Sequence, residues 1–102
     1  MTASDKEIME SARGEECTIR YPGICNGDRE TTVFAHSNAL GAGRGIGHKS
    51  VTLCGAYACQ RCHDVFDGRV PKPAHWTRDD VLLGFYQGHE RTLARLKAKG
   101  LI

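Results

Sequence analysis

The chain of 102 residues lacks an apolar run near the ~20 residues that a membrane-spanning helix needs. Its first residues include acidic groups and form no apolar segment, so we expect no ordinary secretory signal. The chain also lacks a large excess of charge of either sign, because 14 basic and 12 acidic residues leave a net charge of +2. This balance excludes a strongly polybasic protein and is typical of an ordinary globular one, which we expect in the cytoplasm with no membrane partner.

The abundant feature is cysteine, with five in a chain whose length predicts a single domain over residues 1–102. An odd number of thiols cannot all pair within one chain, and clustered thiols in a reducing compartment more often bind metal than form disulfides. A chain this short also has a small core. We therefore expect a bound metal ion to supply part of the folding free energy.

Capping signals predict an N-terminal helix within residues 1–14 and a long C-terminal helix at 77–100. Each begins with a capping box, in which Ser4 or Thr77 is followed three positions later by an acidic residue. In the C-terminal helix, Leu82, Phe85, His89, Leu93 and Leu96 share one face, which predicts a core contact or, alternatively, a homodimer interface.

Shorter elements are expected between these two helices. They are a knuckle or hairpin at 15–28, a strand at 31–35, a strand at 50–53, a connection at 54–58, a helix at 59–67 ended by Gly68, and an extended segment at 69–76. The glycine-rich segment 41–47 predicts a loop, and it is no P-loop because His48 separates its last glycine from Lys49. The overall expectation is a small α+β fold.

The spacing of four cysteines predicts a structural zinc site. Cys59 and Cys62 form a CxxC pair at the start of a helix, and Cys17 and Cys25 flank the upstream knuckle. Tetrahedral zinc takes four such ligands, and a knuckle set against the first turn of a helix is the treble-clef arrangement. Cys54 is the competing fourth ligand, although a small buried hydrophobe is the simpler interpretation of it. A CxxC pair also serves thiol redox chemistry, which stays open as an alternative.

A histidine and a carboxylate overlap this zinc motif. His63 and Asp67 are four residues apart, so on a helix they share a face and could hold a hard divalent ion such as Mg²⁺ or Mn²⁺. His36 stands at the end of a predicted strand and could act as a general base on water. Each residue alone also suits a purely structural role. Together they predict metal-assisted hydrolysis of a nucleic-acid backbone.

Several ordered motifs then resemble a known family. They are Arg13–Cys17, the Cys-Asn-Gly at 25–27, the Val-Phe-Ala-His at 33–36, and the Ala-Cys-Gln-Arg-Cys-His-Asp at 58–64 followed by Asp67. Over residues 12–70 these motifs resemble the YbcO-type nucleases of lambdoid prophages, which look like small relatives of HNH (His-Me finger) endonucleases.

This resemblance implies a ββα-metal core over residues 15–70. It places the general base on His36, the divalent ion on His63 and Asp67, and structural zinc on the four cysteines at 17, 25, 59 and 62. It also implies a bacterial host cell and a role in phage DNA processing or recombination, with a recombination protein as a partner. Many HNH enzymes have an acidic residue or a second histidine just before the base, where this chain has Ala35.

Basic residues predict where DNA would lie. The candidates are Arg44, Lys49, Arg61 and Arg69, together with a C-terminal third that carries seven basic and three acidic residues. An endonuclease is the first hypothesis. A zinc-stabilised nucleic-acid-binding module without catalysis is the alternative, and a thiol redox or metal-handling protein is the third.

Overall fold

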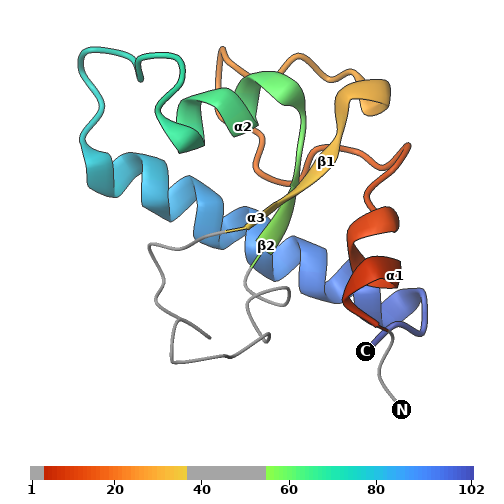
Figure 1. Cartoon of the computed structure of the whole chain (residues 1–102). Coiled ribbons are helices and arrows are strands. Elements are labelled where there is room, and N and C mark those ends of the chain that lie inside the picture. The colour runs from red at the N-terminus through yellow and green to blue at the C-terminus, as the bar shows by residue number, and fades with distance from the viewer. Residues whose placement is uncertain (1–3, 37–54) are drawn as a thin grey trace.

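A computed structural model describes residues 4–36 and 55–102 (Figure 1). Its elements, in chain order, are α1 (Asp5–Glu10), the 3-10 helix η1 (Arg29–Thr31), β1 (Val33–His36), β2 (Gly55–Ala58), α2 (Gln60–Asp67) and α3 (Arg78–Ala98). This part of the chain is therefore α+β, with a two-stranded sheet and three α-helices, as expected. None of the helices described is long and apolar enough to cross a membrane.

Both predicted capping boxes are present. The Ser4 hydroxyl accepts the Glu7 N–H at 3.2 Å, and the Glu7 carboxylate accepts the Ser4 N–H at 3.1 Å. At the start of α3, Thr77 and Asp80 make the same reciprocal pair at 2.8 and 3.1 Å. Helix α1 ends at Glu10, earlier than expected, and the chain continues in turns.

The sheet differs from expectation in its second strand. Strand β2 occupies residues 55–58, which were predicted to be a connection, and it pairs antiparallel with β1 in the register Val33↔Ala58 to His36↔Gly55. The strand predicted at 50–53 and the loop at 41–47 lie outside the described residues. Thr31 belongs to η1 rather than to β1. The knuckle region 15–28 contains turns and no strand.

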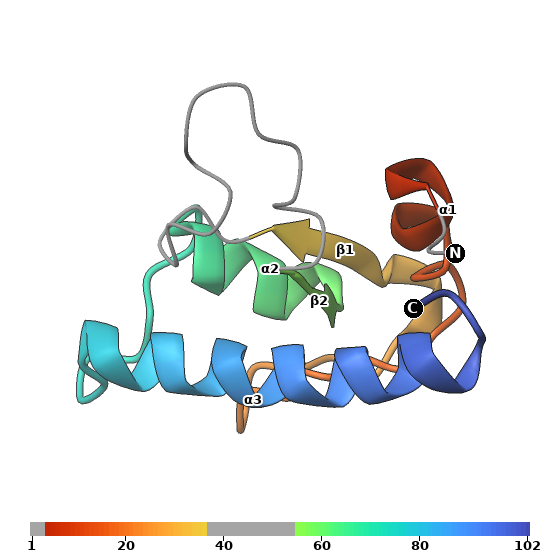
Figure 2. The ribbon, with the colours of Figure 1, turned by 90° about the horizontal axis from the view of Figure 1, so that it is seen from below.

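Backbone and side-chain groups from other segments hydrogen-bond to the outer edge of β2. Thr18 donates its N–H to the Tyr57 carbonyl at 2.9 Å, and the Thr92 hydroxyl accepts the Tyr57 N–H at 3.0 Å. His89 Nδ1 lies 2.8 Å from the Gly55 carbonyl oxygen, which can only accept, so this nitrogen carries a proton. Helix α3 therefore runs along the sheet and ties it to the knuckle (Figure 2).

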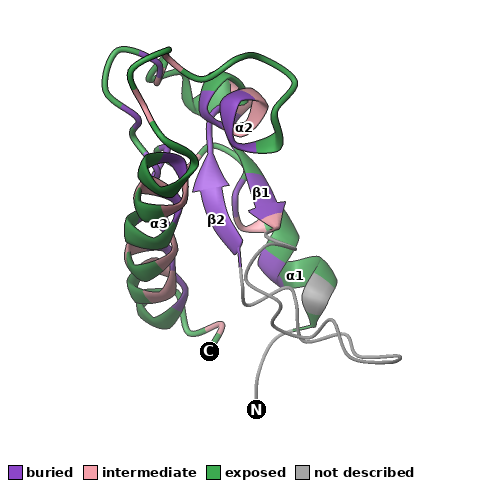
Figure 3. Ribbon diagram, turned by 90° about the vertical axis from the view of Figure 1, so that its left-hand side faces the viewer, coloured by how far each residue is buried: buried purple, intermediate pink, exposed green. Residues whose placement is uncertain are grey.

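The core lies between α3, the sheet and α2 (Figure 3). Strand β2 is buried throughout, and the rings of Phe66 on α2 and Phe85 on α3 stack at 4.2 Å. A second cluster joins both ends of the chain to the sheet; its buried members are Ile8, Ala12, Phe34, Tyr57 and Leu96. The buried face of α3 is Val81, Phe85, Gly88, Thr92 and Leu96. The predicted stripe is thus rotated, with Leu82 and Leu93 only partly buried at its margin.

Candidate functional site

Four thiols converge where the knuckle meets the first turn of α2. The sulfur atoms of Cys17, Cys25, Cys59 and Cys62 all lie within 4.8 Å of one another. Three of these side chains are buried and Cys25 is half-buried. The described part of the chain holds no other group of three or more potential metal ligands. The predicted set of four is therefore brought together.

The distances fit a tetrahedral ion. Zinc–sulfur bonds of about 2.3 Å place the sulfurs of a tetrahedral site about 3.8 Å apart. The Cys25 and Cys59 sulfurs are 3.8 Å apart. Backbone N–H groups also point at two of the sulfurs, from Arg20 to Cys17 and from Cys62 to Cys59, each at 3.5 Å. Such donors stabilise thiolates, so this cluster could bind a metal such as zinc.

The thiols also differ in acidity. A hydrogen bond from the Cys62 thiol is the largest influence on Cys17 and lowers its pKa to about 5. Burial raises the pKa of Cys25 to about 11, and the bond to Cys17 raises that of Cys62. One thiolate is thus stabilised by the other thiols. Loading a metal on all four cysteines must release the remaining protons, so binding will weaken as the pH falls.

Helix α2 carries the predicted histidine–carboxylate pair one residue after Cys62. His63 Nε2 lies 3.1 Å from Asp67 Oδ2, and both side chains are partly exposed. Ligands about 2.1 Å from an octahedral ion occupy adjacent corners about 3.0 Å apart, so this spacing suits a divalent ion that keeps several waters. The Arg69 guanidinium lies 3.7 Å from Asp67 Oδ2 and 3.8 Å from Asp64 Oδ1.

A hollow of about 370 Å³ opens beside His63, between η1, β1 and α2. Its other lining residues are Glu30, Thr31, Val33, Gln60, Asp64 and Arg69. Sequence reasoning missed Glu30, Thr31 and Gln60, because only the folding of η1 against α2 brings them to the histidine. The Thr31 hydroxyl accepts the Gln60 N–H at 3.2 Å and fixes that contact.

His36 ends β1 and is half-buried. Its ring packs edge-on against Phe34, with centroids 5.4 Å apart. Because side chains alternate along a strand, both rings share the face opposite Ala35, which lies in the core with Cys59 and Cys62. Over residues 4–36 and 55–102 the structure does not gather His36 into a single ligand cluster with His63 and Asp67.

Of the four arginine and lysine residues predicted to contact DNA, the structure describes two. Arg61 is exposed on α2, and Arg69 is engaged with two aspartates. Arg44 and Lys49 lie outside the described residues, as does the competing zinc ligand Cys54. Part of the basic C-terminal charge is neutralised within the chain. Glu15 forms ion pairs with Arg95 at 2.8 Å and with Lys99 at 2.6 Å.

Comparison with known proteins identifies a family that this chain matches along most of its length. A model of the family described as "Putative nuclease YbcO" matches residues 6–101. Two relatives, "Putative nuclease YbcO" of Escherichia coli K12 and "Putative nuclease ybcO" of Enterobacteria phage 82, are each 44% identical over 64 residues. The match covers 63% of this chain and 66% of each relative, just under two thirds of their length. A solved structure titled a putative bacteriophage protein from Escherichia coli K-12 is 33% identical, with a TM-score of 0.69 over 90% of this chain and 98% of that one.

Proposed function

Because the chain belongs to the family described as "Putative nuclease YbcO", we propose that it is a metal-dependent endonuclease that hydrolyses DNA phosphodiester bonds. His36 is the general base in this proposal, and His63 with Asp67 holds the divalent ion. A structural zinc is held by Cys17, Cys25, Cys59 and Cys62. A role in phage DNA processing, with a homodimer or a recombination protein as partner, belongs to the same proposal.

The observation that carries this proposal is the His63–Asp67 pair on α2, the helix whose N-cap and first turn supply Cys59 and Cys62 to the thiol cluster. The elements follow one another as β1, β2 and α2. This strand–strand–helix order supports a ββα-metal, treble-clef core of the HNH type. In this proposal the base, His36, stands at the end of the first strand, and the ion ligands, His63 and Asp67, stand on the helix.

The chemistry divides between the ion and the chain. A divalent ion on His63 and Asp67 would supply Lewis-acid stabilisation of the charge that develops on the phosphodiester oxygens. His36, with its ring held edge-on by Phe34, takes a proton from the attacking water through the imidazole lone pair. Arg69, already beside Asp67, offers a guanidinium to a neighbouring phosphate.

Cleavage of supercoiled plasmid in Mg²⁺ or Mn²⁺ tests the proposal. We expect the wild type to cut and His36→Ala to lose at least about 100-fold in rate, the usual contribution of a general base. Asp67→Asn should also lose activity, while Asp79→Asn, an equal charge change on the exposed first turn of α3, should retain it. Equal zinc content and circular dichroism spectra must be established first. Cleavage that persists in His36→Ala would assign the base elsewhere.

One observation favours the second candidate, a zinc-stabilised nucleic-acid-binding module without catalysis. The described residues supply the second ion site with only two ligands, and Arg69 already approaches one of them. A positive guanidinium there competes with a cation. If neither the wild type nor His36→Ala cuts plasmid, yet both bind DNA equally and with salt dependence, this alternative replaces the endonuclease.

A further inference from the structure

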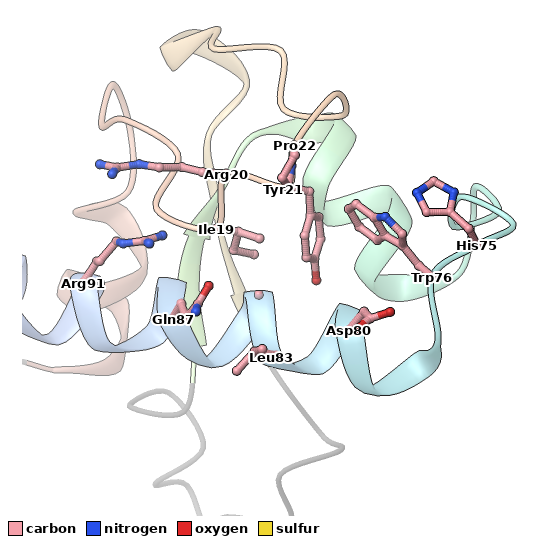
Figure 4. A pocket seen from close by; sticks show the side chains of 11 residues that line it. Ile19, Arg20, Tyr21, Pro22, His75, Trp76, Asp80, Leu83, Gln87 and Arg91 are labelled. Carbon is pink, nitrogen blue, oxygen red and sulfur yellow. The ribbon is translucent and has the colours of Figure 1, made fainter.

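A groove of about 410 Å³ lies between the knuckle and α3, outside the residues assigned above to catalysis (Figure 4). One wall comes from Ile19 to Pro22 and the other from the α3 face that runs from Asp80 to Arg91. The eleven helical rises from residue 80 to residue 91, at 1.5 Å each, span about 16 Å. This volume falls in the range of ligand-binding pockets, which is about 300–1,000 Å³.

Two guanidinium groups gather at one end of the groove, on Arg20 and Arg91 (Figure 4). Each is anchored by a backbone carbonyl: Arg20 Nε donates to Cys17 at 3.1 Å, and Arg91 Nη1 donates to Thr18 at 2.6 Å. Within the described residues neither makes an ion pair, unlike Arg29, which pairs with Glu16 at 3.6 Å. Both arginines therefore keep their charge and spare N–H donors for an anion.

The backbone of Arg20 is unusual. Its φ of 58° lies in the left-handed region. Among the described residues, Arg20 is the only residue other than glycine with a positive φ. This conformation turns the Arg20 N–H toward the Cys17 sulfur at 3.5 Å. The cation is thereby fixed to the knuckle, and glycine would adopt the same backbone without strain.

Aromatic rings form the opposite end of the groove (Figure 4). Trp76 is half-buried and packs edge-on against Tyr21 at 5.6 Å, with exposed His75 beside it at 6.4 Å. The Tyr21 hydroxyl donates to the Val81 carbonyl at 2.7 Å. Asp80 also lines this end, where its Oδ2 accepts the Thr77 N–H at 2.8 Å and completes the capping box of α3.

The wall between the two ends is rigid. A methyl group on Gly84 would lie 2.5 Å from a Tyr21 ring carbon, and one on Gly88 would lie 2.8 Å from the Ile19 Cα. The knuckle thus packs directly on the backbone of α3. The groove exists before any ligand binds, which lowers the cost of binding.

We propose that this groove binds single-stranded nucleic acid, with a base stacked on Trp76 and phosphates paired with Arg20 and Arg91. Cations at one end and an aromatic platform at the other are the features that bind single strands without regard to sequence. At the stacked spacing of 3.4 Å per nucleotide, about 16 Å accommodates about five nucleotides. The choice of a nucleic acid over a peptide rests on the proposed nuclease function and on the two unpaired cations.

Trp76 is the single tryptophan of the chain, so its fluorescence reports directly on the groove. We expect an oligothymidylate of about eight nucleotides, added to zinc-loaded protein without Mg²⁺ or Mn²⁺, to quench Trp76 saturably. Arg20→Gly should bind about fivefold more weakly and should lower the slope of log K against log salt by about 0.7, the value for one lost contact to a single strand. Lys97→Gln, an equal charge loss on the exposed face of α3, should change affinity less than twofold.

Three results would overturn the proposal: no quenching, equal weakening in Arg20→Gly and Lys97→Gln, or a salt slope that Arg20→Gly leaves unchanged. Absence of quenching would favour a protein partner as the ligand of the groove. Plasmid cleavage without quenching would refute the groove alone. Arg20-dependent quenching in a protein that cuts nothing would refute the nuclease alone, so the two failures can be told apart.

Discussion

Replacing Cys17 by serine tests whether the four-cysteine cluster holds this fold together. The Cys17 sulfur lies within 4.8 Å of the sulfurs of Cys25, Cys59 and Cys62. Serine keeps the size of the side chain, but its hydroxyl is a poor zinc ligand. The variant therefore removes one of four thiolates and leaves the rest of the knuckle in place.

The expected magnitude follows from the number of ligands. Structural zinc sites contribute about 10–16 kcal/mol, which is about 3 kcal/mol for each of four thiolates. That loss corresponds to roughly 100-fold in zinc affinity. For a chain of about 100 residues, each kcal/mol shifts the melting temperature by about 4–8 °C, so Cys17→Ser should melt more than about 10 °C lower at equal zinc.

Zinc content by mass spectrometry and the visible spectrum of the cobalt-substituted protein are the assays. The wild type should carry one metal ion per chain and show the sulfur-to-cobalt absorption of a tetrahedral thiolate site. Cys54→Ser is the matched control, because Cys54 is the remaining cysteine and lies outside the cluster assignment. Zinc affinity unchanged in Cys17→Ser, or lost in Cys54→Ser, would refute the assignment of ligands.

Three further perturbations test the packing around the sheet and the knuckle. Thr92→Val should cost about 2 kcal/mol in urea unfolding, because a buried backbone N–H of β2 loses its acceptor, whereas Thr92→Ser should cost less than half of that. Pairing with Lys99 lowers the pKa of Glu15 below its ordinary 4.5, so this carboxylate stabilises the fold above that pH and ceases to do so as the pH falls further. The stability difference between wild type and Glu15→Gln, about 1 kcal/mol at pH 7, should therefore disappear once the pH falls below the lowered pKa of Glu15. A difference that stays constant with pH would contradict the pairing. Gly55→Ala should lower the melting temperature measurably, since its methyl group would lie 2.1 Å from a Phe34 ring carbon, and an unchanged value would exclude that close approach.

Features that depend on residues close together in the chain could be predicted from the sequence. The capping boxes at Ser4 and Thr77, and the glycine at position 68 that ends α2 with a φ of 82°, depend on neighbours within four residues. The four thiols were also predictable, because metal ligation imposes a small set of residue types and places two of them on one helical turn.

Features that depend on contacts between distant parts of the chain could not be predicted in this way. Gly-Ala-Tyr-Ala at 55–58 has little intrinsic strand preference, and it forms β2 because Thr18 and Thr92 satisfy the Tyr57 backbone. The internal neutralisation of Arg95 by Glu15 joins residues 80 positions apart. No local pattern marks such partners.

The sequence by itself determined where the capped helices start and which residues offer thiol, imidazole and carboxylate groups. The tertiary structure decided which of these groups meet. It gathered Cys17 and Cys25 with the CxxC pair, and it set Arg20 and Arg91 at one end of a groove with Trp76 at the other. The physical reason is range: caps and i,i+4 pairs act within one helical turn, whereas a metal cluster or groove exists only after distant segments have packed together.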